Sequence, residues 1–136
     1  AYGWGRKGVR PGEAMTHAMH DLVFRWPARQ YASAHQGVTW LYEMEWRSDA
    51  CDGELGACHG IELPFVFKTL DCVTGERGLA GSNPPAELAE RVHAIWVGFA
   101  RDGSLPWRRW NGDRFVYQLA VGDTVVEPPM PAAASL

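Results

Sequence analysis

The sequence lacks the features of a membrane protein, a disulfide-rich domain or a nucleic-acid-binding protein. A spanning helix needs about 20 consecutive apolar residues, and no run in the chain approaches that length. Three cysteines, an odd number, argue against a disulfide framework and favour a reducing compartment. The net charge of -3 gives no indication of nucleic acid or an anionic membrane as partner. No signal peptide is visible, so we expect a cytoplasmic protein.

The chain has the size of one domain. It contains 136 residues, and its hydrophobic content of 46% is ordinary for a soluble globular protein. Several of the seven tryptophans are expected to lie in the core, because large aromatic side chains bury the most area. The first residue is Ala1 rather than Met, which predicts that the chain was cut from a longer protein.

Two helical regions are predicted. In the first, Pro27 is expected to kink the helix or to divide it near 13–26 and 27–36. Its apolar face consists of Met15, Met19, Leu22, Val23 and Trp26. The second region opens with Asn83 as N-cap and Pro84 in the first helical position, and Gly103 ends it. Its apolar stripe consists of Leu88, Val92, Ile95, Trp96 and Phe99.

One long strand and a hairpin complete the expected architecture. Residues 38–46 are rich in β-branched and aromatic side chains, which favours a strand. Residues 115–121 alternate in polarity, and Gly122-Asp123 suits a tight turn into a partner strand at 124–127. The segment 128–136 is expected to be a disordered tail. The fold class is therefore α/β.

A histidine segment, GACHGIELPFVF, occupies residues 56–67 and contains the main candidate site residue, His59. Gly60 can adopt positive φ, and the run that follows is apolar except for Glu62. This pattern places an imidazole at the edge of a packed surface. From chemistry alone, His59 is only a candidate general base, because a base needs a nucleophile and an orienting acid.

The histidine segment resembles the catalytic-histidine segment of the type-B carboxylesterases, whose pattern is roughly G-A-x-H-x-x-E-L-P-F-V-F. The resemblance extends to residues 20–27, to residues 34–46, to the helix ending near Gly103 and to the C-terminal hairpin. It implies the C-terminal portion of an α/β-hydrolase sheet, with one long strand, a hairpin and two or three flanking helices. It further implies ester hydrolysis through a serine acyl-enzyme, without cofactor or metal, and His59 as the triad histidine.

The chain departs from this family in lacking the other catalytic elements. None of its five serines stands in the nucleophile motif G-x-S-x-G; they are Ser33, Ser48, Ser82, Ser104 and Ser135. The glycine-rich oxyanion loop is missing, and the triad acid is expected upstream of residue 1, so neither Glu13 nor Asp21 is assigned that role. We expect the chain alone to be inactive, to pair with the N-terminal remainder of the hydrolase domain and to self-associate.

Other interpretations stay open at this stage. Cys51, Cys58, His59 and Cys72 could form a Cys₃His zinc set, although the spacing C-x₆-C-H-x₁₂-C lacks a close cysteine pair. A non-catalytic adhesion module of the same superfamily is a second alternative. Glu62 is expected to be a buried structural carboxylate, the run 63–67 to be mainly core, and the segment 107–110 to be a solvated loop rather than a nucleic-acid contact.

Overall fold

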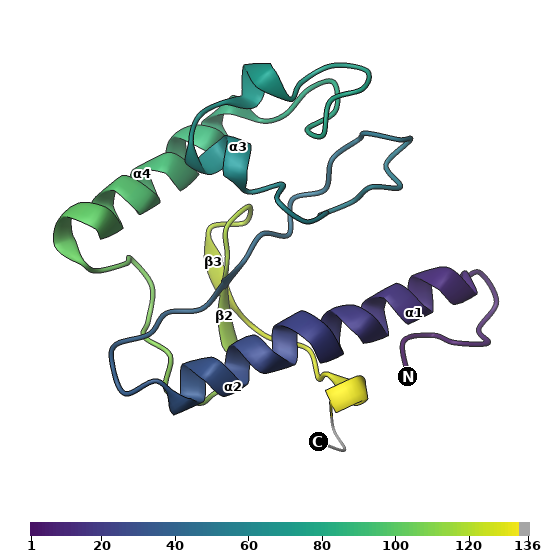
Figure 1. Ribbon diagram of the computed structural model, residues 1–136, viewed down its shortest axis with the longest axis horizontal. Helices are drawn as coiled ribbons and strands as arrows, with labels where there is room; N and C mark the ends of the chain where they lie inside the picture. Colours follow the sequence, from purple (N-terminus) through teal and green to yellow (C-terminus); the bar gives the residue numbers. More distant parts are fainter. Residues whose placement is uncertain (134–136) are drawn as a thin grey trace. The chain divides into compact units, whose positions relative to one another are not determined.

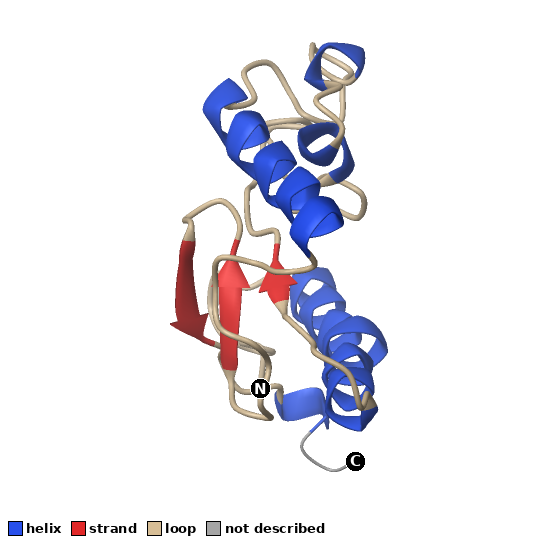
Figure 2. Ribbon diagram, turned by 90° about the vertical axis from the view of Figure 1, so that its left-hand side faces the viewer, coloured by secondary structure: helices blue, strands red, loops and turns tan. Residues whose placement is uncertain are grey.

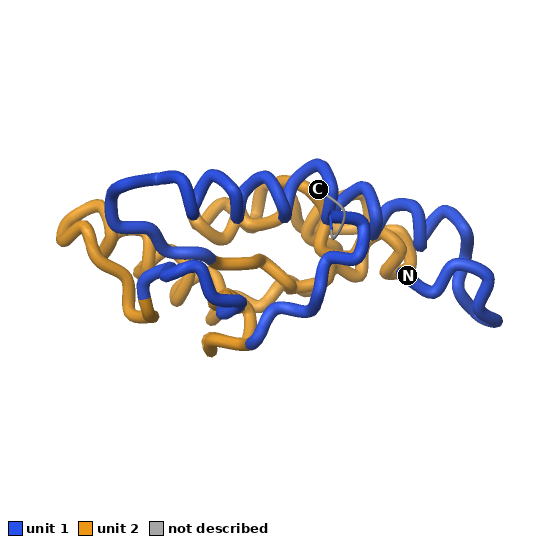
Figure 3. The backbone as a smooth tube through the Cα atoms, turned by 90° about the horizontal axis from the view of Figure 1, so that it is seen from below, with its two compact units in different colours: residues 1–41, 109–115, 126–136 blue, residues 42–108, 116–125 orange. Residues whose placement is uncertain are grey.

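The computed structural model describes residues 1–133 (Figure 1). The Cα trace divides into two compact units, where the sequence predicts a single domain (Figure 3). Unit 1 comprises Ala1–Leu41, Arg109–Phe115 and Val126–Leu136, and unit 2 comprises Tyr42–Arg108 and Val116–Val125.

The N-terminal helical region is one continuous stretch with three parts. These are α1 (Pro11–His20), the π-helical turn η1 (Asp21–Arg25) and α2 (Trp26–Ala34). In η1 the N–H of Trp26 donates to the carbonyl oxygen of Asp21, five residues earlier. Pro27 follows this turn. A proline has no N–H to donate, and in an ordinary α-helix its ring clashes with the carbonyl group four residues earlier. The wider π turn accommodates the ring. Pro27 therefore changes the helical repeat instead of dividing the helix.

A mixed three-stranded sheet has the order β1-β2-β3 (Figure 2). β1 (Tyr42–Glu43) pairs in parallel with β2 (Phe115–Gln118). β2 and β3 (Asp123–Val126) run in opposite directions and form the predicted hairpin (Figure 2). Their connection is longer than the predicted two-residue turn, and Gly122 adopts φ of 83° there, a conformation that glycine reaches without a Cβ clash.

The predicted strand over residues 38–46 is wrong in extent. Only Tyr42 and Glu43 lie opposite ladder partners, on β2. Upstream, the carbonyl oxygen of Thr39 accepts a hydrogen bond from the backbone N–H of Trp110 at 2.7 Å, outside any strand. Strand propensity measures how well side chains fit a pleated surface, so the segment forms a strand only where a neighbouring strand lies beside it.

The C-terminal helix, α4 (Ala86–Asp102), ends as predicted and begins differently. Gly103 caps it with φ of 64°, whereas Pro85 occupies the N-cap and no side chain caps the first turn. Asn83 is therefore not the N-cap. Leu88 is 6% exposed and Phe99 is 43% exposed. The predicted apolar stripe is thus buried in the first half of α4 and partly exposed in the second half.

The core of unit 2 brings together residues far apart in sequence. Its most deeply buried side chains are Ile61, Phe65, Val92, Val116 and Leu119, each at most 2% exposed. They come from the histidine segment, α4 and the β2 hairpin, so the segment that contains His59 rests on this core.

Two residues of the segment 107–110, Trp107 and Arg109, pack against aromatic side chains of their own unit. In unit 2, Trp107 stacks on Tyr117 with ring centroids 4.0 Å apart and an interplanar angle of 4°. In unit 1, the guanidinium of Arg109 lies 5.7 Å from the ring centroid of Trp40. The segment is therefore more closely packed than the predicted solvated loop.

The apolar face predicted on the first helical region is exposed. Met15, Met19 and Val23 are 55%, 43% and 45% exposed. Phe24, on the neighbouring position of η1, is 61% exposed. Contiguous exposed apolar side chains of this kind mark surfaces that bind another chain or segment.

The C-terminal segment is partly ordered. Pro131–Ala133 form the short 3₁₀ helix η3, and Ala133 is 7% exposed. The predicted disorder over 128–136 is therefore not found at residues 131–133, and residues 134–136 lie outside the described part of the chain. Within residues 1–133, no helix combines the length and apolar character needed to cross a membrane.

Candidate active site

His59 lies in a tight turn that leads directly into the short helix α3 (Leu63–Val66). Gly56 and Gly60, on either side of it, have φ of 59° and 77°, as the sequence allowed for Gly60. The N–H of Ile61 donates to the carbonyl oxygen of Cys58, and that of Leu63 donates to Gly60, each at 3.2 Å. The imidazole itself is exposed.

The apolar run after His59 is only partly core. Phe65 is fully buried and packs edge-on against Trp46, with ring centroids 5.0 Å apart. Leu63 and Phe67 are 51% and 66% exposed. One face of α3 therefore anchors the turn while the other faces outward, because Leu63 and Phe67 lie one helical turn apart.

The loop before the histidine segment is tied down by polar contacts. The N–H of Ser48 donates to the carbonyl oxygen of Gly56 at 3.2 Å, and the buried Ser48 hydroxyl accepts from the N–H of Ala50 at 3.0 Å. The Oδ1 of Asp49 accepts from the N–H of Ser82 at 2.9 Å. A Cβ at Gly81 would come within 1.6 Å of that oxygen. Glycine at position 81 is therefore required for this close approach.

No serine hydroxyl is hydrogen-bonded to His59 in the described part of the chain. The imidazole of His59 forms no hydrogen bond with any residue of the range 1–133. Ser48 is buried and bonded to the backbone, and the hydroxyls of Ser33, Ser82 and Ser104 are not bonded to His59 either. Ser135 lies outside the described residues.

Glu62 differs from its predicted structural role. It is half-buried, and among residues 1–133 its carboxylate forms neither a hydrogen bond nor an ion pair. Burial, and secondarily the negative charge of Glu62, raises the pKa of Tyr42. Glu62 therefore acts on Tyr42 through its charge. It is not the buried structural carboxylate that the sequence predicts.

The cysteines do not form the alternative zinc set. Burial raises the pKa of the Cys58 thiol, which favours the protonated form over the thiolate needed for metal binding or nucleophilic attack. Cys51 and Cys72 are exposed. Within residues 1–133, no three His, Cys, Asp or Glu side chains are grouped to hold a metal ion.

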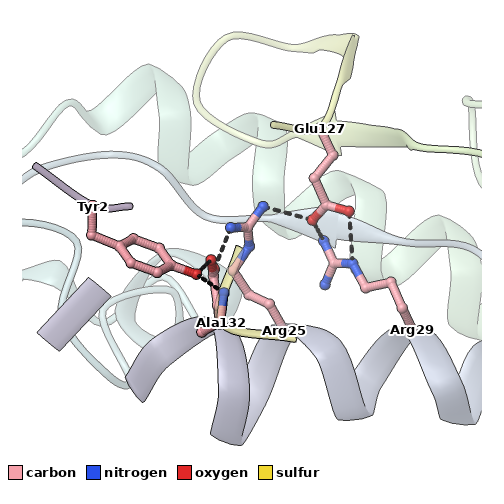
Figure 4. A network of polar contacts seen from close by, with 6 residues as sticks. Tyr2, Arg25, Arg29, Glu127 and Ala132 are labelled. Carbon is pink, nitrogen blue, oxygen red and sulfur yellow. Dashed lines mark hydrogen bonds and ion pairs between the residues drawn. The ribbon is translucent and has the colours of Figure 1, made fainter. Parts of the chain in front are cut away.

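Asp21, the acid left unassigned by sequence, belongs to a buried polar network in unit 1 (Figure 4). Its carboxylate accepts from the Tyr2 hydroxyl at 2.5 Å and from Arg25 Nη1 at 2.6 Å. Arg25 Nη2 donates to Glu127 Oε1 at 2.7 Å, and Arg29 Nε donates to Glu127 Oε2 at 3.1 Å. Asp21 is therefore committed to structure.

The sequence alone does not reveal this network. Its local signal is the spacing of Asp21, Arg25 and Arg29 by four residues, which places them on one helix face. Glu127, about a hundred residues later in the chain, and Tyr2 join it only through the tertiary fold. The η3 segment is attached as well, because the N–H of Ala132 donates to the Tyr2 hydroxyl at 2.8 Å.

A pocket in unit 1 does not include His59. It has a volume of about 400 Å³ and is lined by residues of α2 and of the segments 110–114 and 127–133.

Comparison with known proteins identifies relatives among esterases. No family model matches the chain. The chain is 39% identical over 130 residues to phenmedipham hydrolase of Pseudarthrobacter oxydans, covering 88% of this chain and 26% of that protein. It is 33% identical over 94 residues to para-nitrobenzyl esterase of Bacillus subtilis (strain 168), covering 68% of this chain and 19% of that protein.

A solved structure of a PNB esterase superposes with a TM-score of 0.69 at 25% identity, covering 88% of this chain and 26% of that chain. The chain spans about a quarter or less of the length of the relatives that it matches. With the small mixed sheet and its helices, these similarities support the resemblance and match the chain to a part of a type-B carboxylesterase-like protein.

Proposed function

We propose that this chain is the histidine-bearing part of a carboxylesterase with the α/β-hydrolase fold. In this proposal His59 is the general base of a serine hydrolase. It takes the proton from the serine hydroxyl as that oxygen attacks the ester carbonyl, and returns it to the leaving alcohol. Imidazole suits this role because it gains and loses a proton near neutral pH.

The single observation that carries the proposal is the placement of His59. The imidazole is exposed and unbonded within residues 1–133, yet the turn that carries it continues into α3, whose Phe65 is fully buried. A surface histidine on a fixed backbone is available to a partner. The match of the surrounding residues to the family pattern, together with the esterase relatives, supports a serine hydroxyl as that partner.

The nucleophile, the oxyanion donors and the triad acid would come from the remainder of the hydrolase domain. Exposed Met15, Met19 and Val23 support a missing partner surface on unit 1. The substrate would be a small carboxylic ester, the location cytoplasmic, and neither nucleic acid nor a membrane would be a partner. The chain alone would then be catalytically silent.

The test uses the gene product that carries this chain together with the sequence upstream of Ala1. Replacing His59 with Gln should lower kcat for para-nitrophenyl ester hydrolysis by about three to six orders of magnitude, because loss of one triad member disables the unit. His17→Gln, at an exposed histidine of α1, is the matched control and should leave kcat unchanged. An H59Q enzyme with near-normal kcat would contradict the proposal.

A fluorophosphonate probe tests the second part. It labels activated serines, so it should label the longer gene product once per chain and should not label residues 1–136 alone. Stoichiometric labelling of the isolated chain would show that a nucleophile is present within it. A longer product without labelling or hydrolysis would instead favour the non-catalytic adhesion module.

A further inference from the structure

The helix that follows His59 is held to α4 by one side-chain hydrogen bond. His93 lies on α4, and its Nδ1 is 2.8 Å from the carbonyl oxygen of Val66, the last residue of α3. Figure 1 shows α3 beside α4 in unit 2. A carbonyl oxygen can only accept a hydrogen bond, so Nδ1 carries the proton in this contact. Within residues 1–133, no other side-chain hydrogen bond joins α4 to α3.

The Val66 carbonyl depends on this contact because α3 is too short to satisfy its own last carbonyl groups. The carbonyl oxygens of Leu63 and Pro64 accept from the N–H groups of Phe67 and Thr69, each at 2.9 Å. Val66 is 7% exposed. A buried carbonyl without a partner is unfavourable, so His93 supplies the donor that this end of α3 lacks.

An unbroken series of backbone hydrogen bonds connects this end of α3 to His59. The N–H of Val66 donates to Glu62 at 2.9 Å, that of Leu63 to Gly60 at 3.2 Å, and that of Ile61 to Cys58 at 3.2 Å. His59 lies inside this series. Its own side chain is exposed and forms no hydrogen bond within residues 1–133. The backbone therefore sets the point from which the imidazole extends, at the Cα of His59.

We propose that His93 is a positioning residue for His59, acting through the Val66 carbonyl and α3. The proposal rests on the function proposed above for His59. Besides its packing on α4, α3 is held by the Phe65 ring on Trp46, by the Val66 carbonyl on His93 and, just after its end, by the exposed ion pair of Lys68 with Glu90 of α4. Packing fixes how deeply α3 is buried but allows it to slide or rotate, whereas a directed hydrogen bond fixes its register along α4. His93 neither touches the reacting atoms nor transfers a proton.

The first test is the tautomer of His93 in the chain itself. Long-range ¹H–¹⁵N NMR at a pH where the ring is neutral should show the proton on Nδ1. A proton on Nε2 would overturn the proposal, because Nδ1 could then not donate to Val66.

The second test compares two replacements. His93→Asn keeps an N–H donor close to the position of Nδ1, and His93→Leu keeps bulk but removes the donor. In H93L the amides of Ile61, Leu63 and Val66 should exchange with solvent about 2- to 10-fold faster, the range expected for losing one hydrogen bond, and the His59 ring resonances should shift. H93N should restore both. His17→Leu, at an exposed histidine of unit 1, is the control and should change neither.

These readouts separate the two proposals. None of them requires catalysis, so they test the mechanical link even if H59Q leaves the longer enzyme active. If H93L changes α4 amides but leaves the 58–66 amides and the His59 resonances unchanged, His93 has only a structural role and the proposal is overturned. The proposal is equally overturned if H93N behaves as H93L does, because then packing and not the hydrogen bond matters.

Discussion

The buried network of unit 1 allows one sharp prediction, for Glu127→Gln. Glu127 is 3% exposed and accepts from Arg25 at 2.7 Å and from Arg29 at 3.1 Å. Asp21, Arg25, Arg29 and Glu127 together carry two negative and two positive charges, so the network is neutral. Gln has nearly the same shape as Glu, so E127Q preserves packing while leaving one guanidinium charge uncompensated.

The expected loss follows from burial. The side chains of Arg25, Arg29 and Glu127 are 15%, 12% and 4% exposed, so water can replace little of the lost interaction. Removing one partner of a buried ion pair costs about 3–5 kcal/mol. This is a large part of the stability of a typical domain, about 5–15 kcal/mol. Urea unfolding followed by tryptophan fluorescence should show the midpoint falling accordingly.

The control is an ion pair of the same length on the surface. Arg101 Nη2 and Asp102 Oδ2 are also 2.7 Å apart, but their side chains are 74% and 48% exposed. Asp102→Asn should therefore cost far less than E127Q, and the loss should shrink further in 1 M salt because exposed charges are screened. Equal losses for E127Q and D102N would refute the reasoning, since burial would then not decide the strength of these pairs.

Two further predictions concern pH and association. Burial of the Tyr2 hydroxyl, and then its hydrogen bond to Asp21, raises the pKa of Tyr2 above the ordinary 10.0, so its contribution to stability is complete below that pH and is lost as pH rises through the folded-state value. Tyr2→Phe should flatten the fall of unfolding free energy above pH 10, and an unchanged slope in Y2F would count against the assignment. The exposed apolar face containing Met19 and Phe24 predicts self-association of the isolated chain. Light scattering at micromolar concentration should detect this association, and Met19→Glu should reduce it. A clean monomer of the unsubstituted chain would contradict the prediction.

The local turns around His59 followed from the sequence more closely than the surrounding fold did. The motif of residues 56–67 and the positive φ at Gly60 follow from local residue types, and so does the end of α4 at Gly103, because glycine relieves the same steric conflict in any context. The start of α4 was predicted two residues too early, with Asn83 as N-cap, whereas Pro85 occupies that position without a side-chain cap.

Long-range structure decided the rest. The segment 38–46 has strand-forming residues throughout, but it pairs only at Tyr42 and Glu43 because β2 lies beside those residues alone. Glu62 looked like a buried carboxylate, yet the turn leaves it partly in solvent.

The sequence by itself thus determined the resemblance to esterases and the chain's local turns, since these depend on residue types within a few positions of one another. Only the tertiary structure decided which groups became partners. Glu127 reaches Arg25 across about a hundred residues, and His93 reaches Val66 across 27 residues. Contacts of this kind leave no local periodicity, because a hydrogen bond depends on the final distance between two groups and not on their separation along the chain.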